Sequence, residues 1–174
     1  MHDEWPHVLE TWHEFYLLIG TAGLTLTGLL FVIVSFGART LAHEARTGVP
    51  AFVSPNAVFF TAVLVVSAVF LVPGIPRAAV GWFLCLGSFA SLAYLVSTRA
   101  HRRWSENKLG ALDWVWYIGM PVVTYLLLLA SGIGLLREAE SSMQGTAFSV
   151  VLLLVVGIRN AWDLAVWLAE RQRG

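Results

Sequence analysis

The chain has few of the features that disulfide-bonded proteins and soluble enzymes carry. Its 174 residues include a single cysteine, Cys85, which lies in an apolar run and has no second cysteine to pair with. The sequence contains no glycine-rich phosphate loop, no Ser-x-x-Lys pattern and no paired CxxC motif. Its eleven basic and eleven acidic residues balance, so nothing indicates a nucleic-acid partner. We expect a protein that is not an enzyme.

Further absences bear on domain organisation and cofactors. The first fourteen residues are acidic and lack a basic n-region, so we expect no removable signal peptide. No internal repeat and no long linker divides the chain, which predicts a single domain over residues 1–174. No histidine lies in the middle of an apolar segment, so we expect no haem between membrane helices, and no other cofactor is indicated.

Apolar residues are what the chain has in excess. Hydrophobic residues make up 57% of the sequence and the mean hydropathy is +0.72, whereas soluble domains usually contain about 45–50% apolar residues. A hydrocarbon core about 30 Å thick requires about 20 apolar residues per helix. We therefore expect an all-α membrane bundle of five transmembrane helices, with an amphipathic helix over residues 1–14 on the outer surface. The predicted spans are residues 15–36, 55–72, 78–98, 114–136 and 147–169.

Basic residues are distributed unequally between the two sides of this predicted bundle. One side holds the basic residues within 39–46, 99–108 and 171–173, and the other holds Arg77 and Arg137. By the positive-inside rule, the N-terminus lies outside and the C-terminus lies in the cytoplasm. The sequence thus predicts a multi-pass protein of the bacterial cytoplasmic (inner) membrane, which has the lipid bilayer as a partner.

The last predicted span carries polar groups that a lipid-facing helix would not. They are Arg159, Asn160 and Asp163. A charged residue at the centre of a membrane helix costs roughly 2.5–3.5 kcal/mol, and a strongly apolar residue gains only roughly 0.3–0.6 kcal/mol. This helix therefore needs support from its neighbours. Arg159 and Asp163 are four residues apart, so they lie within pairing distance on one helical face.

Two interpretations of this group remain open. It is either a neutralised pair that tethers the last span to its neighbours, or part of a conduction, relay or ligand site. In both cases we expect its side chains to face the bundle interior or a protomer interface. The hydroxyl groups predicted at a similar depth belong to Thr61, Tyr94 and Tyr117.

The first span carries a line of small and polar residues that we call the polar stripe. At spacings of three and four residues, it is formed by Glu14, Thr21, Thr25, Gly28, Val32, Ser35 and Arg39, with Leu18 filling the gap between Glu14 and Thr21. Small residues let helices approach closely and hydroxyl groups bond across the contact, so the polar stripe can be a packing seam within or between protomers. Alternatively, it lines a wet path around a symmetry axis, because polar side chains select ions in pores.

A cluster of histidines and carboxylates precedes the first span. His7, Glu10 and His13 lie within two turns, and the Glu-x-x-His spacing places Glu10 and His13 on one helical face. Di-iron bundles use this spacing twice, together with further carboxylates, but here it occurs once. The three residues are therefore weak metal candidates. An amphipathic surface helix, whose apolar face includes Trp5 and Trp12, is the alternative.

Both ends of the chain resemble a known group of proteins. The residues that carry the resemblance are Trp12-His-Glu-Phe-Tyr16, Gly20-Thr-Ala, Gly28-Leu-Leu-Phe-Val32 and Arg159-Asn-Ala-Trp-Asp-Leu164. In these segments the chain is similar to a group of small bacterial integral membrane proteins with five spans. The resemblance covers the first and last spans and implies a membrane location, but no activity.

These observations lead to one main functional hypothesis and two alternatives. The main hypothesis is a homo-oligomeric channel or transport protein whose first and last spans build a polar pathway. The first alternative is a non-catalytic subunit or assembly factor of a larger membrane complex, in which the same polar residues fix docking. The second is a metal-binding redox membrane protein, which depends only on the histidines and carboxylates before the first span.

Overall fold

The computed structural model describes residues 4–36, 53–101 and 115–171, and these residues are almost entirely helical. The expected all-α architecture is confirmed for this part of the chain. In order, the helices are α1 (Trp5–Phe36), α3 (Val53–Phe70), α4 (Arg77–His101), the π-helical segment η2 (Val115–Gly119), α6 (Met120–Leu136) and α7 (Ser142–Arg171).

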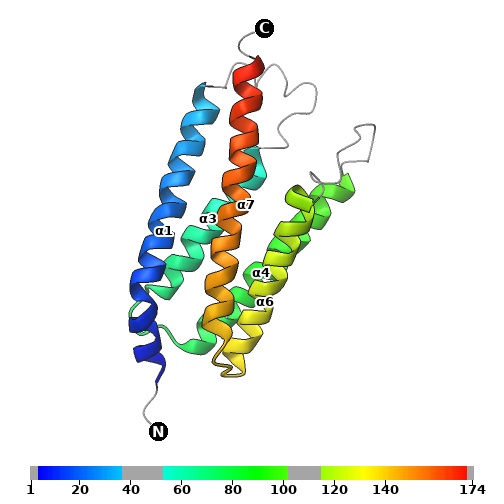
Figure 1. Ribbon diagram of the computed structural model, residues 1–174. Helices are drawn as coiled ribbons and strands as arrows, with labels where there is room; N and C mark the ends of the chain where they lie inside the picture. The colour runs from blue at the N-terminus through cyan, green and yellow to red at the C-terminus, as the bar shows by residue number, and fades with distance from the viewer. Residues whose placement is uncertain (1–3, 37–52, 102–114, 172–174) are drawn as a thin grey trace.

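The helices run up and down in two layers. α7 passes in front of α3 and α6 passes in front of α4, and the two ends of the chain lie at opposite ends of the bundle (Figure 1). The main packing contacts run from α1 to α3, then to α7, α6 and finally α4. α3 and α4 follow one another in sequence, but they scarcely contact each other.

The described bundle carries large apolar side chains on its outside as well as in its core. Large apolar side chains point outward, among them Phe36, Trp162 and Phe31, which are 81%, 70% and 69% exposed. Soluble monomers rarely expose such extensive apolar surface. The core is mainly apolar and also holds small polar side chains, namely Asn56, Ser67, Ser88, Thr124, Ser131, Ser142, Thr146, Ser149 and Asn160. An apolar exterior around helices that pack through small and polar residues is compatible with a membrane protein.

Among the described residues, three helices are long and apolar enough to cross a membrane. They lie within Trp5–Phe36, Arg77–Ser97 and Ser142–Glu170. The apolar parts of the other two helices, Asn56–Phe70 and Met120–Leu136, are shorter. The first, third and last predicted spans therefore correspond to helices of spanning length, and the second and fourth correspond to these shorter helices.

The helix containing Pro121 is irregular at the position that the sequence indicates. Proline has no backbone N–H, so the carbonyl four residues before it loses its α-helical donor. The structure relieves this with the π-helical turn η2, which ends at Gly119 just before α6. The Thr124 hydroxyl bonds the Met120 carbonyl oxygen at 2.8 Å.

The amphipathic segment at the start of the chain is continuous with the first span. From Trp5 onward it forms the first turns of α1. The Trp5 indole N–H donates to the Ile75 carbonyl oxygen at 2.8 Å, and the Arg77 guanidinium lies 5.7 Å from the centre of the Trp5 ring. The start of α1 is thereby fixed to the connection between α3 and α4.

Candidate functional site

The polar stripe lies on the outer surface of α1. Its members from Glu14 to Ser35 are all exposed in the single chain, and Arg39 lies outside the described residues. A Cβ atom added at Gly28 would have no atom within 4 Å. The helices that the structure describes therefore do not cover the polar stripe.

The hydroxyl groups of the polar stripe bond to their own helix. Thr21 donates to the Leu17 carbonyl oxygen at 2.8 Å, Thr25 donates to that of Thr21 at 2.8 Å, and Ser35 donates to that of Phe31 at 2.7 Å. These bonds satisfy the hydroxyl hydrogens, while each oxygen keeps a lone pair that can accept from another donor. The stripe is thus able to face apolar or polar neighbours without an unsatisfied donor.

The opposite face of α1 makes the close packing within the chain. A Cβ atom at Gly20 would lie 2.9 Å from the Ser67 Cβ atom, and one at Gly23 would lie 3.2 Å from the Phe60 carbonyl oxygen. Tyr16 is buried on the same face and stacks on Phe70. At 3.6 residues per turn, Thr21, Thr25 and Gly28 lie on average about 135° around the helix from this face. The seam between α1 and α3 therefore uses Gly20 and Gly23, and the described helices leave the polar stripe exposed.

The charged group on α7 faces the start of α6. The Arg159 guanidinium lies 4.9 Å from the centre of the Trp116 ring in η2, a cation–π contact of a kind worth about 0.5–2 kcal/mol. Arg159 is exposed and Asp163 is half-buried. An inward orientation of Arg159 would therefore need a second copy of the chain, and it stays a prediction.

Asn160 lies on the packed side of α7, and α3 carries a second buried asparagine, Asn56, that the sequence analysis missed. A Cβ atom at Gly157 would lie 2.5 Å from a ring carbon of Phe60, so these positions face each other across the antiparallel pair of α7 and α3. Asn160 and Asn56 each lie about one turn further toward the same end of the bundle. They therefore share one level of this interface.

These two asparagines are the most deeply buried amides in the described part of the chain. Asn160 is 3% exposed and Asn56 is 1% exposed. The Asn160 Oδ1 atom and both polar side-chain atoms of Asn56 have no hydrogen-bond partner among the described residues. The sequence analysis did not single out Asn56, because this residue closely follows Ser54-Pro55, which marks the start of a helix. An amide inside an apolar segment is the signal that could have identified it.

The remaining hydroxyl candidates lie elsewhere. Thr61 lines a groove between α3 and α4, and Tyr94 lies near the same groove beside Leu95. For Tyr117 only the backbone is described, as part of η2. The structure thus places Thr61 beside α4, while the Arg159 guanidinium contacts Trp116.

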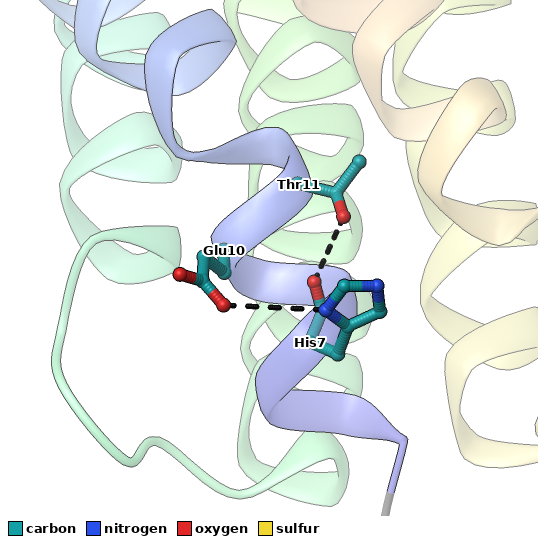
Figure 2. Close-up of polar contacts among 3 residues, drawn as sticks. All are labelled: His7, Glu10 and Thr11. Carbon is teal, nitrogen blue, oxygen red and sulfur yellow. Dashed lines mark hydrogen bonds and ion pairs between the residues drawn. The ribbon is translucent and has the colours of Figure 1, made fainter.

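The histidines before the first span are exposed to solvent. The His7 Nδ1 atom lies 4.0 Å from the Glu10 Oε2 atom, and both side chains are 84% exposed. Figure 2 shows this pair together with the Thr11 hydroxyl, which donates to the His7 carbonyl oxygen. His13 is also exposed. Within residues 4–36, 53–101 and 115–171, no three His, Cys, Asp or Glu side chains form a group that could hold a metal ion.

Comparisons with protein-family models, curated proteins and solved structures find no match for this chain. The candidate site is therefore defined by geometry and residue chemistry alone.

Proposed function

We propose that this chain is a multi-pass protein of the bacterial cytoplasmic membrane that assembles into a homo-oligomeric channel or transport protein. In this proposal, copies of α1 surround a symmetry axis and their polar stripes line the pathway. The observation that supports it most is the exposure of the polar stripe on the face of α1 opposite its packed glycines. The N-terminus lies outside in this arrangement.

The chemistry of the polar stripe suits such a pathway. Threonine and serine oxygens can accept from water or coordinate a cation while their hydrogens stay bonded to the helix backbone. Glu14 lies at the N-terminal end of the stripe and is exposed, so a ring of several copies places carboxylates at the outer mouth. Rings of acidic side chains favour cations in channels.

The group on α7 has a different position in this proposal. Within one chain, Arg159 contacts Trp116 and Asn160 packs toward α3. Neither side chain therefore faces the same side of the bundle as the polar stripe. A pathway lined by both first and last spans therefore requires α1 of one protomer beside α7 of the next. Otherwise α1 lines the pathway alone, and the α7 group only fixes the bundle.

Flux measurements in liposomes test this proposal. Replacing Thr21 and Thr25 together by valine removes two hydroxyl groups without changing side-chain shape, and we expect the ion flux of the parent protein to fall. Thr27→Val is the matched control, because Thr27 lies on the same helix, bonds its own backbone and is partly buried within the chain. Absence of flux for the parent protein with every ion tested, or equal loss in the control, would contradict the proposal.

A second candidate function is a non-catalytic subunit of a larger membrane complex. The exposed surface around Arg159 supports it, because Ile158 and Trp162 beside it are also exposed, at 48% and 70%. Arginine and tryptophan are enriched at the centres of protein interfaces. Purification in mild detergent separates the two functions, since a subunit is recovered with other chains in fixed stoichiometry and a channel is recovered as copies of itself.

A further inference from the structure

The helix formed by η2 and α6 has a weak point in its backbone at Pro121. Because Pro121 has no backbone N–H, the carbonyl four residues before it has no α-helical donor, and the π-helical turn η2 lies directly before α6. Gly119 keeps right-handed helical angles, φ −60° and ψ −52°, so the helix continues through the junction. A Cβ atom at Gly119 would have no atom of the described residues within 4 Å. The backbone is therefore less strongly bonded here and has room to bend.

The two sides of Pro121 are held differently by the rest of the bundle. After Pro121, α6 packs tightly on both α4 and α7. A Cβ atom at Gly132 would lie 3.0 Å from the Gly81 carbonyl oxygen, and one at Gly145 would lie 2.5 Å from the Ser131 Oγ atom. Before Pro121, η2 packs on α7 and not closely on α4. The first part of this helix therefore depends on α7 for its position.

A cation–π contact joins η2 to α7. The Arg159 guanidinium lies 4.9 Å from the centre of the Trp116 ring. Trp116 is half-buried, at the edge of the apolar core. The attraction between a cation and a ring is electrostatic and does not need the interdigitated packing that holds α6 after Pro121. This contact can therefore break while the remaining helices stay packed.

The contact lies at the level of the buried amide on α7. In the antiparallel pair of α6 and α7, Gly145 faces Ser131. Continued along both helices, this register brings Asn160 opposite Trp116, and the contact of the neighbouring Arg159 with that ring agrees with it. Asn160 is 3% exposed, and its Oδ1 atom has no partner among the described residues. Movement of η2 away from α7 therefore uncovers the side of α7 next to this amide.

We propose that η2 swings about its junction with α6 at Gly119 and Pro121, and that the Arg159–Trp116 contact is the latch that holds it against α7. In the latched state the Asn160 amide is buried, and in the open state it is accessible to water. Hinges of this kind are a few residues at the end of an element that absorb the change in backbone angles. The proposal depends only on the packing of α6 and α7, so it stands whether or not α1 lines a pathway.

Hydrogen–deuterium exchange of the full chain in detergent micelles tests the hinge, because it measures local opening along the backbone. In the parent protein, we expect the amides of residues 115–120 to exchange several-fold faster than those of residues 124–136. Trp116→Leu and Arg159→Gln should each raise exchange in 115–120 several-fold further and leave 124–136 unchanged. Pro121→Ala restores the missing backbone donor and should lower exchange in 115–120.

Matched variants separate the latch from a general loss of packing. Trp162→Leu is the control for Trp116→Leu, because Trp162 is a tryptophan near the same level that is 70% exposed. Arg159→Lys keeps a cation beside the ring and should behave like the parent protein. The double variant Trp116→Leu/Arg159→Gln should exchange no faster than the faster single variant, since both substitutions break the same contact.

Thiol labelling measures access to the amide position directly. In a Cys85→Ala background, Asn160→Cys places a thiol on the packed face of α7. We expect N-methylmaleimide to modify it several-fold faster when Trp116→Leu is added, and at an unchanged rate when Trp162→Leu is added. Arg159→Gln replaces Trp116→Leu in this comparison if the latter does not fold.

Three results would overturn the proposal. The first is equal exchange before and after Pro121 in the parent protein. The second is unchanged exchange in residues 115–120, or unchanged thiol labelling, when the latch is removed. The third is an equal increase in the Trp162→Leu control or over the whole of α6, which would show that the substitutions loosen the bundle in general.

Discussion

At the scale of single residues, the buried amides are the least ordinary feature of this chain. Asn56 and Asn160 face each other's helices at one level of the α3–α7 interface, and both are almost completely buried. A buried polar group without a hydrogen bond costs about 1–3 kcal/mol. Two amides on facing helices have the groups needed to satisfy each other, since each carries donors and an acceptor.

We expect the Asn56 and Asn160 amides to share a hydrogen bond in the membrane. Asn160→Leu keeps the branching and the number of heavy atoms of the side chain but leaves Asn56 as the only amide at this level, so it should lower the free energy of unfolding by about 1–2 kcal/mol. The double variant Asn56→Leu/Asn160→Leu should recover part of this loss. Denaturant unfolding in detergent micelles measures both. If each single substitution leaves the free energy of unfolding unchanged, and the double variant shows only the sum of the two single effects, the amides do not interact.

At the scale of elements, the two faces of α1 differ in how closely they are packed, although both carry glycine. Gly20 and Gly23 allow α3 to approach until backbone and side-chain atoms touch, whereas Gly28 faces open space. Glycine costs about 1 kcal/mol relative to alanine inside a helix. This cost is offset on the packed face by close contact with α3, and it has no such compensation within one chain at Gly28.

Alanine substitution separates the two faces of α1. Gly20→Ala/Gly23→Ala inserts methyl groups against Ser67 and the Phe60 backbone, so we expect a lower midpoint of thermal unfolding. Gly28→Ala should leave the midpoint unchanged or raise it, because only helix propensity changes. Circular dichroism melting in one detergent compares them. A Gly28→Ala protein that unfolds earlier than the double variant would contradict the assignment of the packed face.

Hydropathy predicted where the helices lie along the sequence, but it did not predict which helices, and which of their faces, pack together. The predicted spans agree with the helix bounds to within a few residues, apart from α7, which begins five residues early, and α1, which includes the amphipathic start. The sequence did not distinguish the packed face of α1, because Gly20 and Gly23 are interleaved with Thr21 and Thr25. The groove beside Gly87 could not be predicted from the sequence either, because its existence depends on the angle between two helices and not on their composition.

At the scale of the whole molecule, the lengths of α3 and α6 bear on the number of membrane crossings. α3 has 18 residues, which rise about 27 Å, close to a hydrocarbon core of about 30 Å. α6 has 17 residues and is extended by the five residues of η2. Five crossings would place the two termini on opposite sides of a membrane, and the two ends of the chain lie at opposite ends of the bundle in Figure 1.

Cysteine labelling tests both the crossing number and the orientation. In a Cys85→Ala background, we expect Glu4→Cys and Glu138→Cys to react with a membrane-impermeant maleimide in intact cells. Glu170→Cys should react only after permeabilisation, because α7 ends on the cytoplasmic side in the proposed orientation. Labelling of Glu4→Cys and Glu170→Cys from the same side would rule out five crossings, and an exact reversal of the pattern would overturn the orientation alone.

The contact between Trp5 and Ile75 has a consequence for the order in which the molecule is assembled. The two residues are 70 positions apart, so this bond can form only after α3 and the turn that follows it have been synthesised. Arg77 lies over the same indole and comes directly after that turn. Both contacts therefore join the start of α1 to residues that the ribosome delivers before α6 and α7, and neither contact requires the later helices.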